Sequence, residues 1–214
     1  MARMLRTLVA ATLLAGVPLF AAIPTAAMAQ ANRARDPGAE AFVSDGAKQV
    51  LGILNDRGTG IGAKEASFRV VIDRLVDVPK VTRFVLGKYA RTATPDQYAR
   101  FSTAFRAYAE AVYQKRINDY HGETVTVTGS VVRKPGDVLV TTAFGSRSGP
   151  PSILTWRVLG AGNSWKVVDV QVSGVWLAIT QQQDFVSTID NAGGNIDVLI
   201  RQLEADRGGV IHKN

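Results

Sequence analysis

Apolar residues in the first half of the chain recur with the three- and four-residue spacing of amphipathic helices. The pattern predicts two helices separated by a glycine-rich connector at residues 58–62, and a short helix that begins near Asp77. Residues 94–97, Thr-Pro-Asp-Gln, predict the start of a longer helix that reaches Asn118, because they combine an N-cap, a proline at the first helical position and a capping-box glutamine. The residues expected on its apolar face are Tyr98, Phe101, Phe105, Tyr108 and Val112.

After Gly122 the apolar spacing changes to the two-residue alternation of strands. A first strand is expected around Val125 and Val127, and a fifth from Val175 to Thr180. The three strands between them are predicted at Val138–Phe144, Ile153–Leu159 and Trp165–Val172. The short turns between these segments indicate an antiparallel meander.

Two further helical patterns, at residues 185–189 and 196–203, close the chain. Helices, then strands, then helices without a linker predict a single α+β domain with an antiparallel sheet of four to five strands. Several strands carry apolar residues on both faces. Either helices cover both faces of the sheet or the second face lines a cavity, since a half-covered sheet alternates more cleanly.

The first 29 residues have the features of a secretory signal peptide. Arg3 and Arg6 precede an apolar stretch at residues 8–20, and small residues lead to an Ala-Met-Ala ending at 27–29. An uncleaved membrane anchor is the alternative, which the small-residue ending disfavours. We predict a signal peptide at 1–29, a flexible leader at 30–38, one domain at 39–207 and a tail at 208–214. The mature protein is therefore expected to be soluble and exported.

The chain of 214 residues contains no cysteine and two histidines, His121 and His212. The lack of cysteine excludes a disulfide scaffold, a thiolate zinc site, a thiol nucleophile and an iron–sulfur centre. Removal of the signal peptide leaves 23 basic against 18 acidic residues, a formal charge of +5 instead of +7. A basic exported protein suits anionic lipid headgroups or acidic protein partners, and export argues against nucleic acid.

No constellation of catalytic residues stands out in the sequence. Residues 58–63, Gly-Thr-Gly-Ile-Gly-Ala, match a loose dinucleotide-binding fingerprint, but a helical pattern precedes them where that motif needs a strand, so we interpret them as a helix connector. Ser173 or Asp169 together with His121 are the only candidates for an exported hydrolase, and no second carboxylate supports paired-acid catalysis. We therefore expect no enzyme activity, no metal and no cofactor.

Several short segments between about residue 68 and residue 203 form an ordered set. They are FVLGKY at 84–89, TPDQ at 94–97, YHGE at 120–123, WRV at 156–158, WKVVDV at 165–170 and VSGV at 172–175. After a cleavable signal, this set resembles the periplasmic phospholipid-carrier family. That family is the soluble component of the Mla (maintenance of lipid asymmetry) pathway, and is also called the toluene-tolerance substrate-binding family.

The resemblance implies a twisted antiparallel sheet, packed with N- and C-terminal helices around an apolar lipid pocket, with the headgroup towards solvent. A phospholipid with about 30 chain methylenes exposes a penalty on the order of 25 kcal/mol in water, so it needs a shielding cavity. That cavity should lie near the upper end of the usual range, about 1,000 Å³. The residues predicted to line it are Phe84, Phe101, Phe105, Tyr108, Val140, Trp156, Val170 and Trp176.

The same resemblance implies a periplasmic shuttle that helps to maintain the lipid asymmetry of the outer membrane. It would exchange phospholipid between an outer-membrane lipoprotein and an inner-membrane ABC transporter that bears a lipid-binding ring protein. One alternative is a carrier for another hydrophobic ligand, such as a hopanoid. Two others are the exported hydrolase and an interaction module that has a solid core and no ligand.

Overall fold

The computed structural model describes residues 34–56, 58–118, 124–145 and 151–205, with the backbone alone at 112–118. The predicted signal peptide, the tail at 208–214, His121 and His212 lie outside the described residues. None of the helices in this described part of the chain has the length and apolar character needed to cross a membrane.

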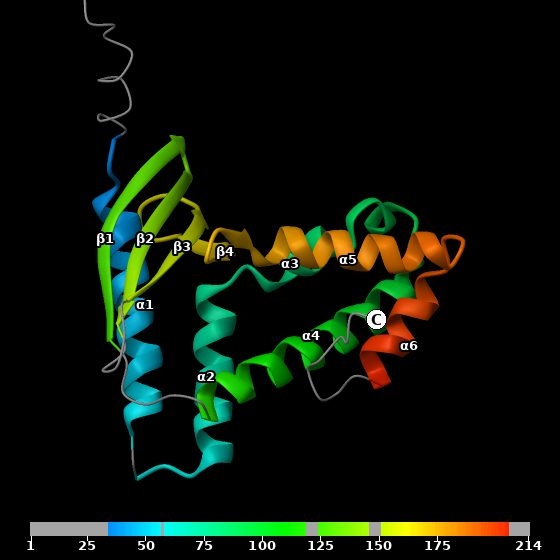
Figure 1. The fold of residues 1–214 in the computed structure, drawn as a ribbon, viewed down its shortest axis with the longest axis horizontal. Coiled ribbons are helices and arrows are strands. Elements are labelled where there is room, and N and C mark those ends of the chain that lie inside the picture. Colours follow the sequence, from blue (N-terminus) through cyan, green and yellow to red (C-terminus); the bar gives the residue numbers. More distant parts are fainter. Residues whose placement is uncertain (1–33, 57, 119–123, 146–150, 206–214) are drawn as a thin grey trace, which may run out of the picture. The chain divides into compact units, whose positions relative to one another are not determined.

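Helices come first, then strands, then helices again (Figure 1). The first group is α1 (Pro37–Asn55), α2 (Ile61–Leu75), α3 (Val78–Val85), the 3-10 helix η2 (Gly87–Arg91) and α4 (Pro95–Asn118). The strands are β1 (Thr124–Lys134), β2 (Asp137–Gly145), β3 (Ser152–Leu159), β4 (Lys166–Val172) and β5 (Val175–Trp176). The chain then forms α5 (Leu177–Asn191) and α6 (Ile196–Ala205). The expected α+β class is confirmed.

Capping residues set the start of several helices. At α4, the Gln97 backbone N–H donates to Thr94 Oγ1 at 3.2 Å, and the Thr94 backbone N–H donates to Gln97 Oε1 at 3.1 Å, so the predicted capping box is present. At α1, the carboxylate of Asp36 accepts from the Ala39 backbone N–H at 2.9 Å. Helix α1 therefore begins at Pro37, ahead of the predicted domain start at residue 39.

The five strands pair antiparallel in the order β1-β2-β3-β4-β5, as the predicted meander requires. The last strand ends at Trp176, so the prediction of a strand up to Thr180 is wrong. The reason is a helix start at Leu177: the Asp169 carboxylate accepts from the Ala178 backbone N–H at 2.8 Å and satisfies one of the free donors there. The six-residue segment was too short to distinguish these two structures.

One hydrophobic core lies among the helices. Helices α4 and α6 make the most extensive contact between helices, and α5 packs against both α3 and α6. Phe101 of α4 is fully buried, stacks on Phe105 with ring centroids 5.8 Å apart, and meets Phe185 of α5 edge-on at 5.9 Å. The aromatic face predicted for α4 is thus the side that packs on α5 and α6.

A second core lies between α1 and one face of the sheet. Val138, Val140 and Val158 are buried on this face beneath Ala39 and Val43 of α1 (Figure 1). The register places Leu139, Arg157 and Asp169 on the opposite face. Charged side chains thus partly occupy the face that the sequence suggested would be covered by helices or would line a cavity.

On this face, Asp137 of β2 is almost fully buried and binds Arg157. The Arg157 guanidinium donates to the two carboxylate oxygens at 3.1 and 2.9 Å, and Arg133 Nη1 lies 3.7 Å from Oδ2. The hydrogen bonds from Arg157 hold the pKa of Asp137 below its ordinary value. The pair therefore joins the start of β2 to β3 and keeps the carboxylate charged into the acid range.

Asp137→Asn should lower the free energy of unfolding by about 1–3 kcal/mol at pH 7, because Arg157 keeps its charge and loses its ionised partner. The folded-state pKa of Asp137 lies below the unfolded value. Its contribution is therefore complete above the unfolded pKa, and it is lost as the pH falls through the folded pKa. Urea unfolding of both proteins should show the difference shrinking below about pH 4.

Asp45→Asn is the matched control, because Asp45 pairs with Lys48 on the exposed surface of α1. It should change the unfolding free energy by less than about 0.5 kcal/mol. A difference between wild type and Asp137→Asn that stays constant with pH would contradict the assignment.

Candidate functional site

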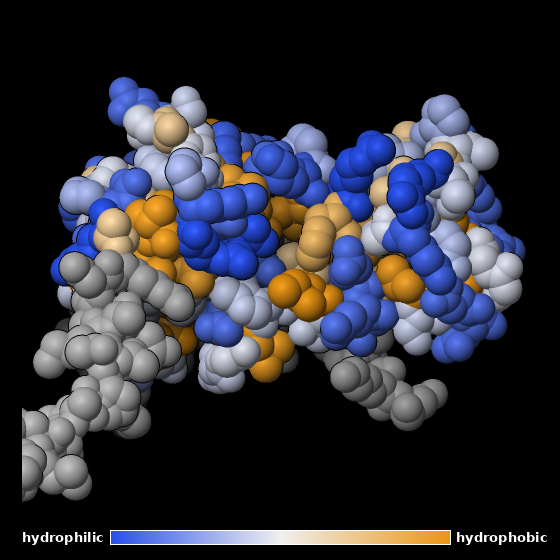
Figure 2. Space-filling model, turned by 90° about the horizontal axis from the view of Figure 1, so that it is seen from above, coloured by the Kyte–Doolittle hydropathy of each residue, from blue (hydrophilic) through white to orange (hydrophobic). Residues whose placement is uncertain are grey.

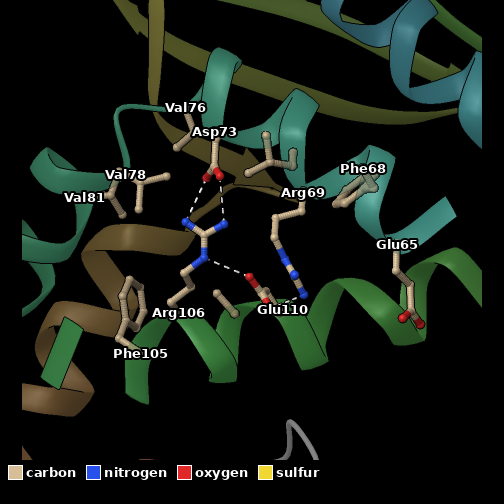
Figure 3. A pocket seen from close by; sticks show the side chains of 12 residues that line it. Glu65, Phe68, Arg69, Asp73, Val76, Val78, Val81, Phe105, Arg106 and Glu110 are labelled. Atoms are coloured by element: carbon tan, nitrogen blue, oxygen red, sulfur yellow. Dashed lines mark hydrogen bonds and ion pairs between the residues drawn. The ribbon is translucent and has the colours of Figure 1, made fainter. Parts of the chain in front are cut away.

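A largely apolar groove runs between α2, α3 and α4. Its apolar lining comes from Phe68, Ile72, Val76, Val78, Val81, Phe105 and Ala109. Its charged lining comes from Glu65, Arg69, Asp73, Arg106 and Glu110. In Figure 3 the ion-paired side chains of Arg69, Asp73, Arg106 and Glu110 lie in the middle, with Val78, Val81 and Phe105 on one side of them and Phe68 on the other.

Helical spacing explains why pairs of apolar residues from α2 and α4 face the groove. Phe68 and Ile72 on α2 are four residues apart, as are Phe105 and Ala109 on α4, so each pair lies on one face of its helix. Phe105 contributes to the groove and also packs against the helical core, where it meets Phe185 edge-on at 5.8 Å. The groove is thus an extension of the helical core to the surface.

The cavity inside the groove measures about 90 Å³. This is far below the cavity of about 1,000 Å³ expected from the sequence, and below the roughly 300–1,000 Å³ of small-molecule sites. The apolar walls of α2, α3 and α4 lie close together in this conformation. A larger ligand therefore requires these walls to separate.

Ion pairs connect α2 to α4 across the groove (Figure 3). The Arg106 guanidinium donates to both oxygens of Asp73 at 2.9 Å and to Glu110 Oε1 at 2.9 Å. Glu110 in turn accepts from Arg69 Nη2 at 2.9 Å. The hydrogen bonds to Asp73 raise the pKa of Arg106, so the guanidinium stays charged at all physiological pH values.

These four side chains are partly exposed, from 29% for Glu110 to 50% for Arg69. Water screens such pairs, and each is worth about 0.2–1 kcal/mol. The connection between α2 and α4 can therefore break at small cost. Glu65 lies apart from it and, among the described residues, forms no ion pair (Figure 3).

The junction between α2 and α3 attaches the groove to the sheet. Val76 forms an isolated parallel bridge with Val167 of β4, and the Asp77 backbone N–H donates to the Val167 carbonyl at 3.0 Å. The Val76 side chain lines the groove and also packs against the core under the sheet. The inner end of the groove therefore adjoins the second core.

The eight predicted lining residues occupy several environments. Phe105 lies on the groove wall, and Phe101 and Val140 are fully buried in the two different cores. Partly buried side chains at the edges of these cores are Tyr108 in the helical one and Trp156 and Val170 in the one under the sheet. Trp176 is half-buried just before α5.

Phe84 is 40% exposed on α3. Further exposed hydrophobic side chains follow at Val175, Leu177 and Ile179, around the start of α5. Figure 2 shows hydrophobic residues at the surface in separate groups among hydrophilic ones. Phe84 is therefore a surface residue in this conformation and lies outside the groove lining.

The sequence analysis did not assign the groove residues of α2 and α3. Phe68 and Ile72 carry the apolar spacing of one helix face, but that spacing does not reveal what the face packs against. In the structure α2 has no fully buried residue, so part of this face lines the groove. The signal for the groove is an apolar helix face that contains no buried residue, and burial can be recognised only in the three-dimensional structure.

Two of the candidate hydrolase residues, Asp169 and Ser173, are described. Asp169 accepts from the backbone N–H groups of Val170 and Ala178, both at 2.8 Å, and burial raises the pKa of its carboxyl. Ser173 lies exposed in the turn between β4 and β5 with φ 49°. Asp169 thus serves as a buried hydrogen-bond acceptor at the start of α5.

One other sequence motif can be placed, and the described residues can be searched for a metal site. The segment at 58–63 follows α1 and leads into α2, which confirms the helix connector and excludes the strand that a dinucleotide fingerprint needs. Among the residues with described side chains, no three of the His, Asp and Glu residues are grouped so that they could hold a metal ion.

Known proteins provide independent comparisons. A solved structure, the phospholipid-binding protein from Ralstonia solanacearum in complex with a phospholipid, matches with a TM-score of 0.70 and 25% identity over 79% of this chain and 96% of that chain. Toluene tolerance protein ttg2D of Pseudomonas putida is 22% identical over 131 residues, which is 61% of each protein. The family model of the MlaC protein matches residues 45–205. This match spans most of the 214 residues, and the chain belongs to the MlaC family.

Proposed function

We propose that this protein is a soluble periplasmic carrier that binds a phospholipid, with the acyl chains in the groove between α2, α3 and α4. The observation that carries the proposal is a largely apolar groove whose walls are connected by partly exposed ion pairs, in a chain of the MlaC family. The similarity to a protein solved with a phospholipid supports the ligand class. A carrier needs no catalytic groups, which fits the structural role of Asp169.

The groove must widen to accept acyl chains, because its cavity of about 90 Å³ is too small for them. Widening separates α2 from α4 and breaks the pairs of Arg106 with Asp73 and of Arg69 with Glu110. The cost is small because these pairs are exposed. Burial of about 30 methylenes returns on the order of 25 kcal/mol relative to a lipid free in water, so a lipid that leaves a membrane is strongly favoured inside the widened groove over the solvent.

Groove widening also gives roles to the predicted lining residues. Trp156 and Val170 lie partly buried at the edge of the core under the sheet, which Val76 connects to the groove. Phe105 and Tyr108 lie at the edge of the helical core. We expect long acyl chains to extend from the groove along both edges, while Phe101 and Val140 support these walls from inside the two cores.

Family membership supports a role in lipid transport. The protein would exchange phospholipid between an outer-membrane lipoprotein and an inner-membrane ABC transporter with its lipid-binding ring protein, and thereby maintain outer-membrane lipid asymmetry. The predicted signal peptide and the basic charge of the mature chain are consistent with a periplasmic protein that approaches anionic membranes.

The mature protein, purified without detergent, should carry a phospholipid that native mass spectrometry detects as an adduct and solvent extraction releases intact. The intact diacyl lipid would support the carrier. A bound hopanoid would instead identify the protein as a carrier of that ligand. Free fatty acid together with lysolipid would support the hydrolase. A protein that is purified without lipid and takes none from vesicles would overturn the proposal.

A further inference from the structure

The charged part of the groove carries both signs in close contact. Two guanidinium groups, Arg69 and Arg106, stand against three carboxylates, Glu65, Asp73 and Glu110, so the formal charge of the groove lining is −1. Arg106 lies between Asp73 and Glu110, and Glu65 lies to one side of these pairs (Figure 3). This arrangement differs from a phosphate site, in which cations outnumber acids.

Widening of the groove leaves charges without partners on α2, whereas Arg106 and Glu110 on α4 stay paired with each other. Asp73 on α2 loses Arg106, and Arg69 on α2 loses Glu110. A lipid phosphate can bind a freed guanidinium in the bidentate manner that arginine favours. A phosphate cannot replace the lost cation beside Asp73. An anionic headgroup therefore provides a new partner for the freed guanidinium and none for the freed carboxylate.

A zwitterionic headgroup provides a partner for both. In phosphatidylethanolamine the phosphate and a primary ammonium group are two carbons apart, and the ammonium group has three N–H donors for carboxylate oxygens. Glu65, which forms no ion pair among the described residues, is an available acceptor at the edge of the groove. The number of ion pairs is then conserved on loading.

We propose that this cluster of five charged residues selects zwitterionic phospholipids with a primary ammonium group over anionic phospholipids. Arg69 and Arg106 bind the phosphate, and Glu65 with the carboxylate freed on opening binds the ammonium group. The inference rests on the proposed carrier function and names its preferred headgroup. Because the groups are partly exposed, the preference is expected to be about threefold to tenfold.

The test loads the mature wild-type chain from vesicles that contain equal amounts of phosphatidylethanolamine and phosphatidylglycerol with identical acyl chains. Bound lipid is extracted, and the ratio of the two headgroups is measured by mass spectrometry. Wild type should be enriched about threefold to tenfold in phosphatidylethanolamine. Glu65→Gln and Glu65→Lys bring the charge of the lining to 0 and +1, and should shift the ratio stepwise towards phosphatidylglycerol.

Glu204→Lys is the matched control, because it makes the same charge change at an exposed position of α6 outside the groove lining. It should leave the headgroup ratio at the wild-type value. Loading of wild type at the vesicle ratio, or an equal shift in Glu65→Lys and Glu204→Lys, would overturn the selectivity alone. A wild-type protein that loads neither lipid would overturn the carrier function together with it.

Discussion

Phe101→Ala is expected to lower the free energy of unfolding by about 3–5 kcal/mol, the range for large aromatic truncations in a core. Phe101 is fully buried and its ring contacts those of Phe105 and Phe185, at centroid distances of 5.8 and 5.9 Å. Its removal leaves a cavity between α4 and α5 and deprives Phe105 of its stacking partner. Urea unfolding followed by far-ultraviolet circular dichroism measures the change.

The loss of packing in Phe101→Ala should also affect the groove, because Phe105 is both the stacking partner of Phe101 and part of the groove wall. Thr103→Ala on the exposed side of the same helix is the control, with an expected change below about 0.5 kcal/mol. If Phe101→Ala cost no more than this control, the packing described for the helical core would be incorrect.

Ala109→Phe should reduce the amount of co-purified lipid by at least about tenfold without unfolding the protein. Ala109 lies on the groove wall, where the cavity of about 90 Å³ leaves little free volume. A phenyl ring at this position occupies the space into which the groove has to widen. A binding free energy weakened by about 1.4 kcal/mol already lowers the affinity for lipid tenfold. Lipid per protein is measured by extraction and mass spectrometry.

Ala107→Phe supplies the control for Ala109→Phe. Residue 107 is exposed on α4 and is absent from the groove lining, so the same change in size should leave lipid loading at the wild-type level. Equal loading of wild type and Ala109→Phe would indicate that the acyl chains bind to another part of the molecule. The first part to test would then be the edge of the sheet core at Trp156 and Val170.

Helix α4 connects these two predictions. One of its sides carries the aromatic contacts of the helical core, and another carries Ala109, Arg106 and Glu110 towards α2. A single helix therefore holds the core together and forms one wall of the proposed binding site. This arrangement explains why α2, the facing wall, has no fully buried residue: part of its apolar face is available for a ligand.

Local signals in the sequence predicted most of the secondary structure. The capping box at 94–97 was recognisable because its hydrogen bonds join residues three apart in the chain. The two-residue alternation and short turns predicted the antiparallel meander, because each strand pairs with the next strand along the chain. The prediction of a strand up to Thr180 was wrong because Asp169, on the preceding strand, supplies the hydrogen-bond acceptor at the start of a helix.

The lining of the site was less accessible to sequence reasoning. Large aromatic residues were predicted to face the pocket, but Phe101 is enclosed by other rings and Phe84 lies at the surface. Periodicity identifies the apolar face of a helix and carries no information on whether that face meets another side chain or open space. The ion pairs between Arg106 and Asp73 join residues 33 positions apart and had no sequence signature.

By itself, the sequence determined the α+β class, the order of helices and strands, and the ordered set of segments that resembles the MlaC family, because these depend on local spacing and local hydrogen bonds. Only the tertiary structure decided that α2, α3 and α4 surround the groove, and that opposite charges on α2 and α4 meet across it. Those features depend on contacts between segments far apart in the chain, whose geometry is set by how whole helices pack.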